Sequence, residues 1–193
     1  MSLLLQLAES DPKLVLHRSE ACDDIAQRLA ELGVRFERWA ANEPLNETST
    51  PDAILRAYSA DIERLKSAWG YRSADVVRLK RDASDAEWPQ KAAGARNKFL
   101  DEHTHAEDEV RFFVEGSGLF YLRLRGMISL VLCERGDLLS VPAGTPHWFD
   151  MGSDPAFCAI RLFGTEAGWV ANFTGDKISA RFPSFDQLRQ SAR

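Results

Sequence analysis

The sequence contains few cysteines and no long apolar run. Its three cysteines, Cys22, Cys133 and Cys158, lie far apart without C-x-x-C spacing, which argues against a disulfide framework or a cysteine metal site. We expect free thiols, which suit a reducing compartment. No apolar stretch approaches the roughly 20 residues of a membrane-spanning helix. The opening residues MSLLLQLAESDPK lack the basic region of a secretory signal. These features favour a cytoplasmic protein without membrane attachment.

An excess of basic charge is also missing. The 193 residues include 24 Lys and Arg but 29 Asp and Glu, which gives a net charge of −5, and no basic patch stands out. Nucleic acid is therefore not an expected partner, because proteins that bind it concentrate Lys and Arg on one face. Hydrophobic residues make up 45% of the chain, which at this length is enough for one sizeable core. We expect residues 1–193 to form a single domain.

The first hundred residues mix helical and strand patterns. Apolar residues recur at helical spacing in three segments: residues 25–32, 54–69 and 88–100. The second segment is expected to be one continuous helix that starts at Thr50 as N-cap, with Pro51 in the first turn, and ends at Gly70. Alternating apolar residues predict strands at Val34–Trp39 and Asp75–Lys80.

From about residue 101 the pattern changes to short β segments. Stretches rich in Val, Ile, Phe and Leu alternate with Gly and Pro, as in VRFFVEGSG, LFYLRLRG, ISLVLCERGD and LLSVPAGTP. Several short strands at this spacing are typical of an antiparallel sandwich or a small barrel. We expect a mainly β fold of the α+β class. Residues 1–100 would supply helices and edge strands that pack on a barrel formed by residues 101–180.

Three of the four histidines and one glutamate are candidates for a metal site. His103 and His105 are two residues apart, so in a strand they face the same side, and Glu109 and Arg111 share a face in the same way. His147 follows the tight turn PAGTP at the expected start of another strand. Three neutral imidazoles and a carboxylate suit a divalent transition metal such as Fe, Ni, Cu or Zn. Four protein ligands on an octahedral ion leave two adjacent positions for a bidentate substrate.

The spacing of these residues resembles the two motifs of the cupin family. The first motif, H-x-H, three or four residues, Glu, six residues and Gly, is met by His103, His105, Glu109 and Gly116. The second, Gly, five residues, Pro-x-Gly, two residues and His, is met by Gly136, Pro142, Gly144 and His147. The sequence departs from the generic motifs at Asn97, where glycine is usual, and at Met151, where asparagine is usual. A generic cupin function is therefore not inferred.

Two longer strings narrow the resemblance. KFLDEHTHAEDEVRFFVEGSGLFYLR and LLSVPAGTPHWFD are similar to the acireductone dioxygenase family of methionine salvage, and the likeness extends over most of the chain. It implies a cupin jelly-roll β-barrel with flanking N-terminal helices. It also implies one Fe(II) or Ni(II) ion, held by His103, His105, Glu109 and His147, and no organic cofactor. The substrates would be the acireductone 1,2-dihydroxy-3-keto-5-methylthiopentene and O₂. The family also favours a monomer.

Arg111 is the expected catalytic residue. It shares strand parity with Glu109 and would therefore face inward, where a cation needs an anionic partner such as a dianionic substrate. The family resemblance supports this role. The alternative is a solvated strand residue that pairs with Glu107 or Glu115.

The resemblance also implies substrate contacts and residues beside the ligands. Arg161 would bind substrate, although it is about as consistent with an outward-facing strand residue. Phe99, Phe149 and Trp169 would surround the methylthio tail, or else belong to the core. Glu102 and Asp108 match acidic positions that flank the ligands, where they would serve metal incorporation and conformational coupling or orient the histidines.

Three other functions are compatible with this pattern. The first is another metallocupin enzyme that acts on a different enolic substrate. The second is a binding module for a metal or ligand, without catalysis. The third is a structural metal site, in which protein ligands would close the coordination sphere of the ion.

Overall fold

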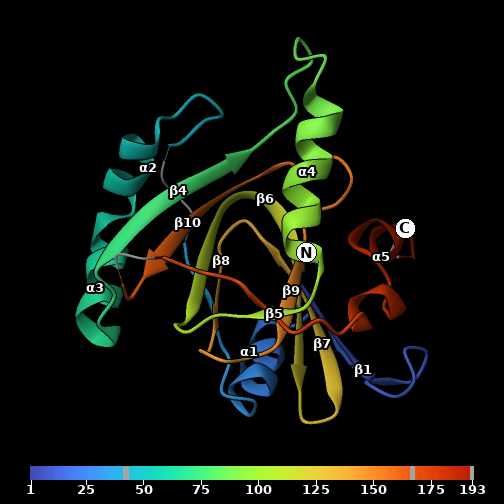
Figure 1. Ribbon diagram of the computed structural model, residues 1–193. Helices are drawn as coiled ribbons and strands as arrows, with labels where there is room; N and C mark the ends of the chain where they lie inside the picture. The colour runs from blue at the N-terminus through green and yellow to red at the C-terminus, as the bar shows by residue number, and fades with distance from the viewer. Residues whose placement is uncertain (41–43, 166–167, 192–193) are drawn as a thin grey trace.

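The computed structural model describes residues 1–40, 44–165 and 168–191 as an antiparallel β fold with helices around it (Figure 1). The strands are β1 (Leu3–Ala8), β2 (Val15–Ser19), β3 (Arg35–Arg38), β4 (Ser73–Leu79), β5 (His103–Thr104), β6 (Glu109–Leu124), β7 (Met127–Glu134), β8 (Asp137–Val141), β9 (His147–Asp150), β10 (Phe157–Phe163) and β11 (Asn172–Phe173). The helices are α1 (Cys22–Ala30), α2 (Pro51–Ala57), α3 (Ser59–Trp69), α4 (Trp88–Leu100), the 3₁₀ helix η1 (Ile178–Arg181) and α5 (Phe185–Ser191). Within these ranges, no helix is both long and apolar enough to span a membrane.

Strand β6 belongs to both layers of the fold. Its first half pairs with β10 and β8, and its second half pairs with β7 and β9. The two layers are therefore β4–β10–β6–β8–β3 and β11–β5–β9–β6–β7–β1–β2. Two separate segments were expected here, whereas the chain forms one bent strand. Gly116, at φ 68°, lies at the bend, where a Cβ atom would be 1.8 Å from the Ala156 carbonyl oxygen.

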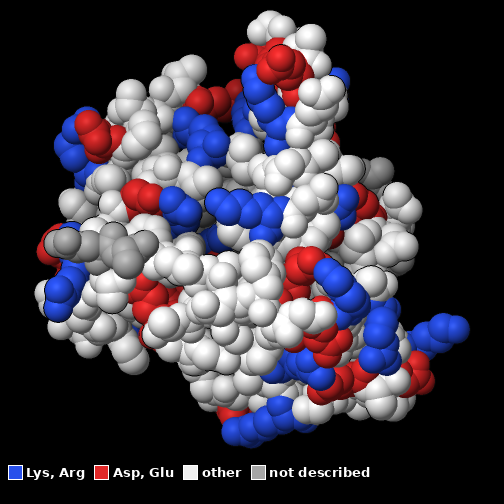
Figure 2. Space-filling view, viewed as in Figure 1, with Lys and Arg blue, Asp and Glu red and all other residues white. Residues whose placement is uncertain are grey.

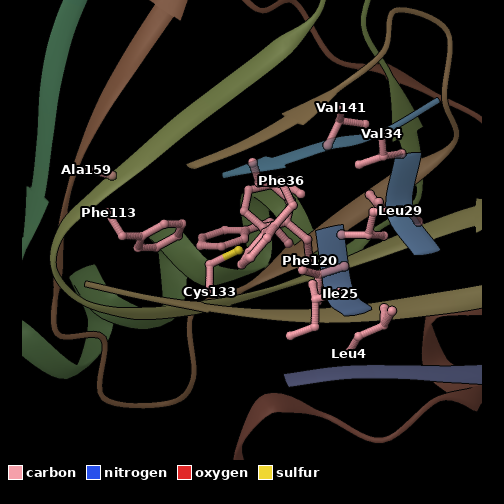
Figure 3. Packing of buried hydrophobic residues seen from close by; sticks show 14 of the residues in the cluster. Leu4, Ile25, Leu29, Val34, Phe36, Phe113, Phe120, Cys133, Val141 and Ala159 are labelled. Atoms are coloured by element: carbon pink, nitrogen blue, oxygen red, sulfur yellow. The ribbon is translucent and has the colours of Figure 1, made fainter. Parts of the chain in front are cut away.

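The main core lies between these two layers. Apolar side chains from β1, β3, β6, β7, β8, β9 and β10 meet there, together with Ile25 and Leu29 of α1. Figure 3 shows these side chains gathered between the strands. Burial of this apolar area is the main force that closes the layers on each other. The cysteines are free thiols, as expected, and Cys133 and Cys158 are buried.

Helices α2 and α3 cover an outer face of the sheet. Figure 1 shows α2 and α3 on the outer side of β4, and their apolar residues share a second core with β6 and β10. The predicted continuous helix over residues 51–69 is wrong in one respect. The backbone leaves helical geometry at Tyr58, at φ −105° and ψ 18°, and the Tyr58 ring packs edge-on against Phe112 at 4.9 Å. The two predicted ends are confirmed, with Thr50 accepting the Ala53 amide and Gly70 in the left-handed conformation.

Two further elements carry or support the site. Helix α4, predicted over 88–100, is found at these bounds and packs against β9. The predicted strands at Val34–Trp39 and Asp75–Lys80 correspond to β3 and β4 with shifted ends. Strand β1 was not anticipated. Its apolar run LLLQLA lies between β2 and β7 in the sheet, which explains why both of its faces are largely buried.

Candidate metal centre and active site

Four side chains from separate elements converge in the interior. His103 is on β5, His105 follows it, and Glu109 and His147 are the first residues of β6 and β9. One ligand atom from each residue lies within 4.8 Å of the others, and all four residues are buried. Strand pairing brings the distant parts of the chain together, because His103 lies directly opposite His147. The predicted ligand set therefore occupies one place in the fold.

Backbone carbonyls fix the orientation of all three imidazole rings. Nδ1 of His103 donates to the Asp101 carbonyl at 2.8 Å, and Nδ1 of His105 donates to the Val170 carbonyl at 2.9 Å. Nδ1 of His147 donates to the carbonyl of Thr145 at 2.7 Å. A carbonyl oxygen only accepts hydrogen bonds, so each Nδ1 carries the proton and each neutral ring keeps its lone pair on Nε2. This arrangement is typical of metal-binding histidines.

The electrostatics of the centre favour a carboxylate surrounded by imidazoles. Burial lowers the pKa of His103 to about 4, so this ring stays neutral near pH 7. Burial also acts to lower the pKa of His105, but the neighbouring Glu109 carboxylate and the Val170 carbonyl outweigh it and raise that pKa. Burial acts to raise the pKa of Glu109, yet Arg111 and the two histidines beside it hold that pKa well below its usual range. Glu109 is therefore ionised.

The donor atoms fit a divalent cation. Nε2 of His105 and Nε2 of His147 lie 3.0 and 3.1 Å from the same oxygen, Oε2 of Glu109. When the two rings are neutral, both Nε2 atoms direct a lone pair at a negatively charged oxygen. A cation between these atoms relieves the resulting repulsion. Three imidazole nitrogens and one carboxylate oxygen are a donor set that first-row transition metals accept.

Arg111 lies buried beside Glu109 within a set of aromatic rings. Its Nε atom is 2.8 Å from Oε1 of Glu109, but the contact lacks hydrogen-bond alignment, so both atoms are left without a hydrogen-bond partner. The guanidinium carbon lies 4.5 to 5.9 Å from the ring centroids of Phe149, Phe120, Trp169 and Phe99. Burial lowers the Arg111 pKa, but a guanidinium with an adjacent carboxylate remains charged.

A cavity of about 530 Å³ opens onto the centre. Its walls include His105, Glu109, Arg111 and most of the predicted substrate contacts, namely Arg161, Phe99 and Trp169. Phe149 is placed differently: it lies in the core beneath the Arg111 guanidinium and is not part of the cavity wall. Figure 2 shows Lys and Arg side chains gathered near the middle of the face seen in that view.

Glu102 and Asp108 lie near the ligands without contacting a histidine ring in the described residues. Buried Glu102 pairs with Arg123 at 3.2 Å and accepts a hydrogen bond from Thr174. Asp108 accepts the Ala143 amide at 2.9 Å, in the turn before His147. Both carboxylates therefore hold the backbone segments that carry the ligands, whereas carbonyls orient the rings.

Sequence reasoning missed several residues of the cavity. Asp75 and Lys98 line it together with the predicted residues, and Phe173 stacks edge-on against the His103 ring at 5.7 Å. No local motif marks Asp75, because its position depends on pairing between β4 and β10. The carbonyls that hold the histidines also leave no signal in the sequence, since every residue has one.

Comparison with known proteins agrees with this geometry. Residues 8–171 match the family model described as the ARD/ARD′ family. The chain belongs to this family. The chain is 51% identical over 186 residues to an acireductone dioxygenase of Yersinia enterocolitica, covering 96% of this chain and 100% of that one. It is 54% identical over 183 residues to an acireductone dioxygenase of Pseudomonas paraeruginosa, with coverage of 95% and 98%.

The ARD/ARD′ assignment extends to the three-dimensional fold. The structure is similar to that of an acireductone dioxygenase from Bacillus anthracis that has a cadmium ion in its active centre. The TM-score is 0.75 at 31% sequence identity, and the match covers 90% of this chain and 98% of the other. The expected cupin-type β fold with additional helices is thus confirmed.

Proposed function

We propose that this chain catalyses the acireductone dioxygenase reaction, the oxidative cleavage of 1,2-dihydroxy-3-keto-5-methylthiopentene by O₂. The observation that carries the proposal is the convergence of three Nε2 atoms and one buried carboxylate at the end of a cavity that also contains a buried arginine. The curated relatives that match nearly the whole chain support the same activity.

The proposed metal ligands are His103, His105, Glu109 and His147, and the proposed ion is one Fe(II) or Ni(II). When bound, such an ion would supply a Lewis acid that withdraws charge from the enediol oxygens and favours their ionisation. The donor set suits both metals. A cadmium ion in the active centre of the Bacillus anthracis protein supports a divalent ion at this place.

Arg111 would stabilise the negative charge of the ionised substrate. Its guanidinium is held among aromatic rings and excluded from bulk water, so its attraction for an anion in the cavity is weakly screened. Its orientation is set by Glu109 on one side and by Phe149 on the other. Because both contacts exist before substrate arrives, no reorganisation of the arginine is needed during the reaction.

The remaining cavity residues would position the substrate. Arg161 would contact its polar end, while Phe99 and Trp169 would pack against the methylthio tail. Phe149 would not contact the substrate, and its ring would instead help to position Arg111. Glu102 and Asp108 would keep the ligand-bearing segments in place.

The metal would decide the products. The Fe(II) form would give formate and 4-methylthio-2-oxobutanoate, whereas the Ni(II) form would give carbon monoxide, formate and 3-methylthiopropanoate. The protein ligands are the same for both metals. The difference in products would therefore arise from the orientation in which the substrate is held for its reaction with O₂.

Oxygen uptake with synthetic acireductone tests the proposal. The metal-loaded protein should consume O₂ above the rate of a buffer blank, and chelation should abolish the excess. A binding module would retain the acireductone without accelerated uptake. A metallocupin for another enolic substrate would bind it poorly and show no accelerated uptake.

We further infer a monomeric protein of the cytoplasm. Free thiols at Cys22, Cys133 and Cys158 support a reducing compartment. Light scattering of the purified protein tests the oligomeric state, where a mass near twice that of the chain would contradict the monomer.

A further inference from the structure

Three charged residues form one row across neighbouring strands. Arg161 of β10 lies directly opposite Asp75 of β4 on one side and opposite Arg111 of β6 on the other. All three side chains line the same cavity. Glu109 extends the row, because it pairs with Arg111. The order of charges from the cavity rim to the metal centre is therefore negative, positive, positive and negative.

Asp75 fixes the guanidinium of Arg161 through two parallel hydrogen bonds. Nε and Nη2 of Arg161 donate to Oδ1 and Oδ2 of Asp75 at 2.8 and 2.5 Å. This forked geometry restrains both the position and the plane of the guanidinium. Among the described residues Nη1 makes no hydrogen bond, so it remains available to a ligand in the cavity. The group also lies 5.3 Å from the Phe163 ring and 5.6 Å from the Trp169 ring.

Without Asp75, Arg161 would be repelled from the site. Like charges directly opposite each other on paired strands are unfavourable, and Arg111 is such a neighbour. Glu109 is engaged by Arg111 and by two histidines, and so is not free to hold a second arginine. The Arg161 side chain is 29% exposed, which gives it a path out to solvent.

We infer that Asp75 is a positioning residue that holds Arg161 against Arg111, with Nη1 directed to an anionic substrate. The inference rests on the proposed function, since it takes the acireductone dianion as the ligand. Asp75 would not touch the reacting atoms. Asp75 would keep the Arg161 side chain ordered before the substrate binds. Little of the binding free energy would then be lost in ordering that side chain.

A double-mutant cycle tests this role. The variants are Asp75→Asn, Arg161→Gln and the double variant, with Glu47→Gln as control, because Glu47 is an exposed partner of Lys80 outside the cavity. The measurement is an anaerobic titration of each metal-loaded protein with acireductone, which gives a dissociation constant without turnover. Metal content and melting temperature of all five proteins should agree, since these ion pairs are partly exposed.

Asp75→Asn should weaken binding roughly tenfold, the scale of one charge-assisted hydrogen bond. Arg161→Gln should weaken it by a similar or larger factor, and Asp75→Asn should add nothing in the Arg161→Gln protein. Glu47→Gln should bind as the parent does. Two results would overturn the inference: parent-like binding by Asp75→Asn, or an equal loss from Asp75→Asn with and without Arg161. A general structural role of Asp75 would give the second result.

The parent protein separates this inference from the proposed function. If the parent neither binds acireductone nor consumes O₂ with it, the proposed function fails. If the parent binds and turns over while Asp75→Asn is indistinguishable from it, only the positioning role fails.

Discussion

Nε2 of His105 lies 3.0 Å from Oε2 of Glu109, while Nδ1 of the same ring donates to the carbonyl of Val170. The carbonyl dictates which nitrogen carries the proton of the neutral ring, and in that ring the nitrogen that faces the carboxylate has a lone pair. Two electron-rich atoms are thus held together by the fold. A cation that both atoms can bind resolves their repulsion, and the same relation recurs between His147 and Glu109.

Replacement of His147 should remove metal and activity together. His147→Ala deletes one of three imidazoles but leaves the apolar core intact, so the purified protein should fold and hold little Fe or Ni. Its melting temperature should fall toward that of the chelated parent, because a metal bound only by the folded state stabilises it. The measurements are metal analysis, oxygen uptake and thermal melting.

The matched control is His17→Ala. His17 pairs with Asp24 at 2.7 Å, away from the metal centre, and its loss should leave metal content unchanged. Full metal occupancy in His147→Ala would remove this residue from the ligand set.

Arg111 should affect turnover without affecting metal content. Arg111→Ala removes the buried charge that faces the substrate, at a cost of about 2–4 kcal/mol in transition-state stabilisation, or roughly 30- to 1,000-fold in rate. Arg111→Lys should recover part of this, because it keeps the charge but loses the planar donor. The spectrum of bound acireductone distinguishes dianion from monoanion. Normal dianion binding and parent-like turnover by Arg111→Ala would show that the residue is structural.

Gly116 should be essential for the bend of β6. In Gly116→Ala the new Cβ would meet the Ala156 carbonyl oxygen at 1.8 Å, and this backbone contact can be relieved only by moving the strand. We expect the free energy of unfolding to fall by more than about 3 kcal/mol, measured by urea denaturation.

Gly126→Ala separates this clash from backbone strain. Gly126 has a similar φ of 74° but no atom within 4 Å of its Cβ position, so only the cost of the left-handed conformation remains, about 1–2 kcal/mol. Equal losses in the two variants would contradict a steric role for Gly116.

The ion pair between buried Asp150 and partly exposed Arg96 should govern stability in acid. Burial acts to raise the pKa of Asp150, but two hydrogen bonds from Arg96 and the amides of Phe185 and Gly152 outweigh it and lower that pKa. The stabilisation is therefore fully present above the unfolded-state pKa near 3.9 and is lost as the pH falls through the lower folded pKa. Asp150→Asn should be less stable than the parent by about 2–3 kcal/mol at pH 7, with a smaller difference below pH 4.

Asp154→Asn is the control for this pair. Asp154 is 60% exposed and lies 3.8 Å from Arg81, so its loss should change stability by about 0–1 kcal/mol. Urea denaturation at pH 7 and at pH 3.5 gives all the required values. A difference between Asp150→Asn and the parent that stays constant over this range would contradict the linkage.

The ligand set could be predicted from sequence because local spacing fixes most of it. His103, His105 and Glu109 lie within seven residues, and the turn before His147 has its own glycine and prolines. The helix break at Tyr58 could not be predicted, since the apolar pattern continues across it and the break accompanies packing against Phe112. Strand β1 was missed because LLLQLA lacks the alternation of a strand with one wet face.

The pairing of strands that are distant in the sequence also could not be predicted. The strand pattern alone left the direction of Arg161 even between solvent and cavity, and only the family resemblance favoured the substrate side. The pairing of β10 with β4 and β6 places Arg161 in the cavity wall. Phe149 was expected among the substrate contacts, but it is buried in the core and packs against the Arg111 guanidinium. Both positions depend on register, which no single segment encodes.

Product analysis after metal exchange tests the central claim most directly. The chelated protein would be reloaded with Fe(II) or with Ni(II), supplied with acireductone and O₂, and its gas and acid products quantified. The claim predicts that chelated protein matches the buffer blank, that the Fe(II) form yields 4-methylthio-2-oxobutanoate without carbon monoxide, and that the Ni(II) form yields carbon monoxide with 3-methylthiopropanoate. Equal turnover by chelated and reloaded protein, or one product set whichever metal is bound, would contradict it.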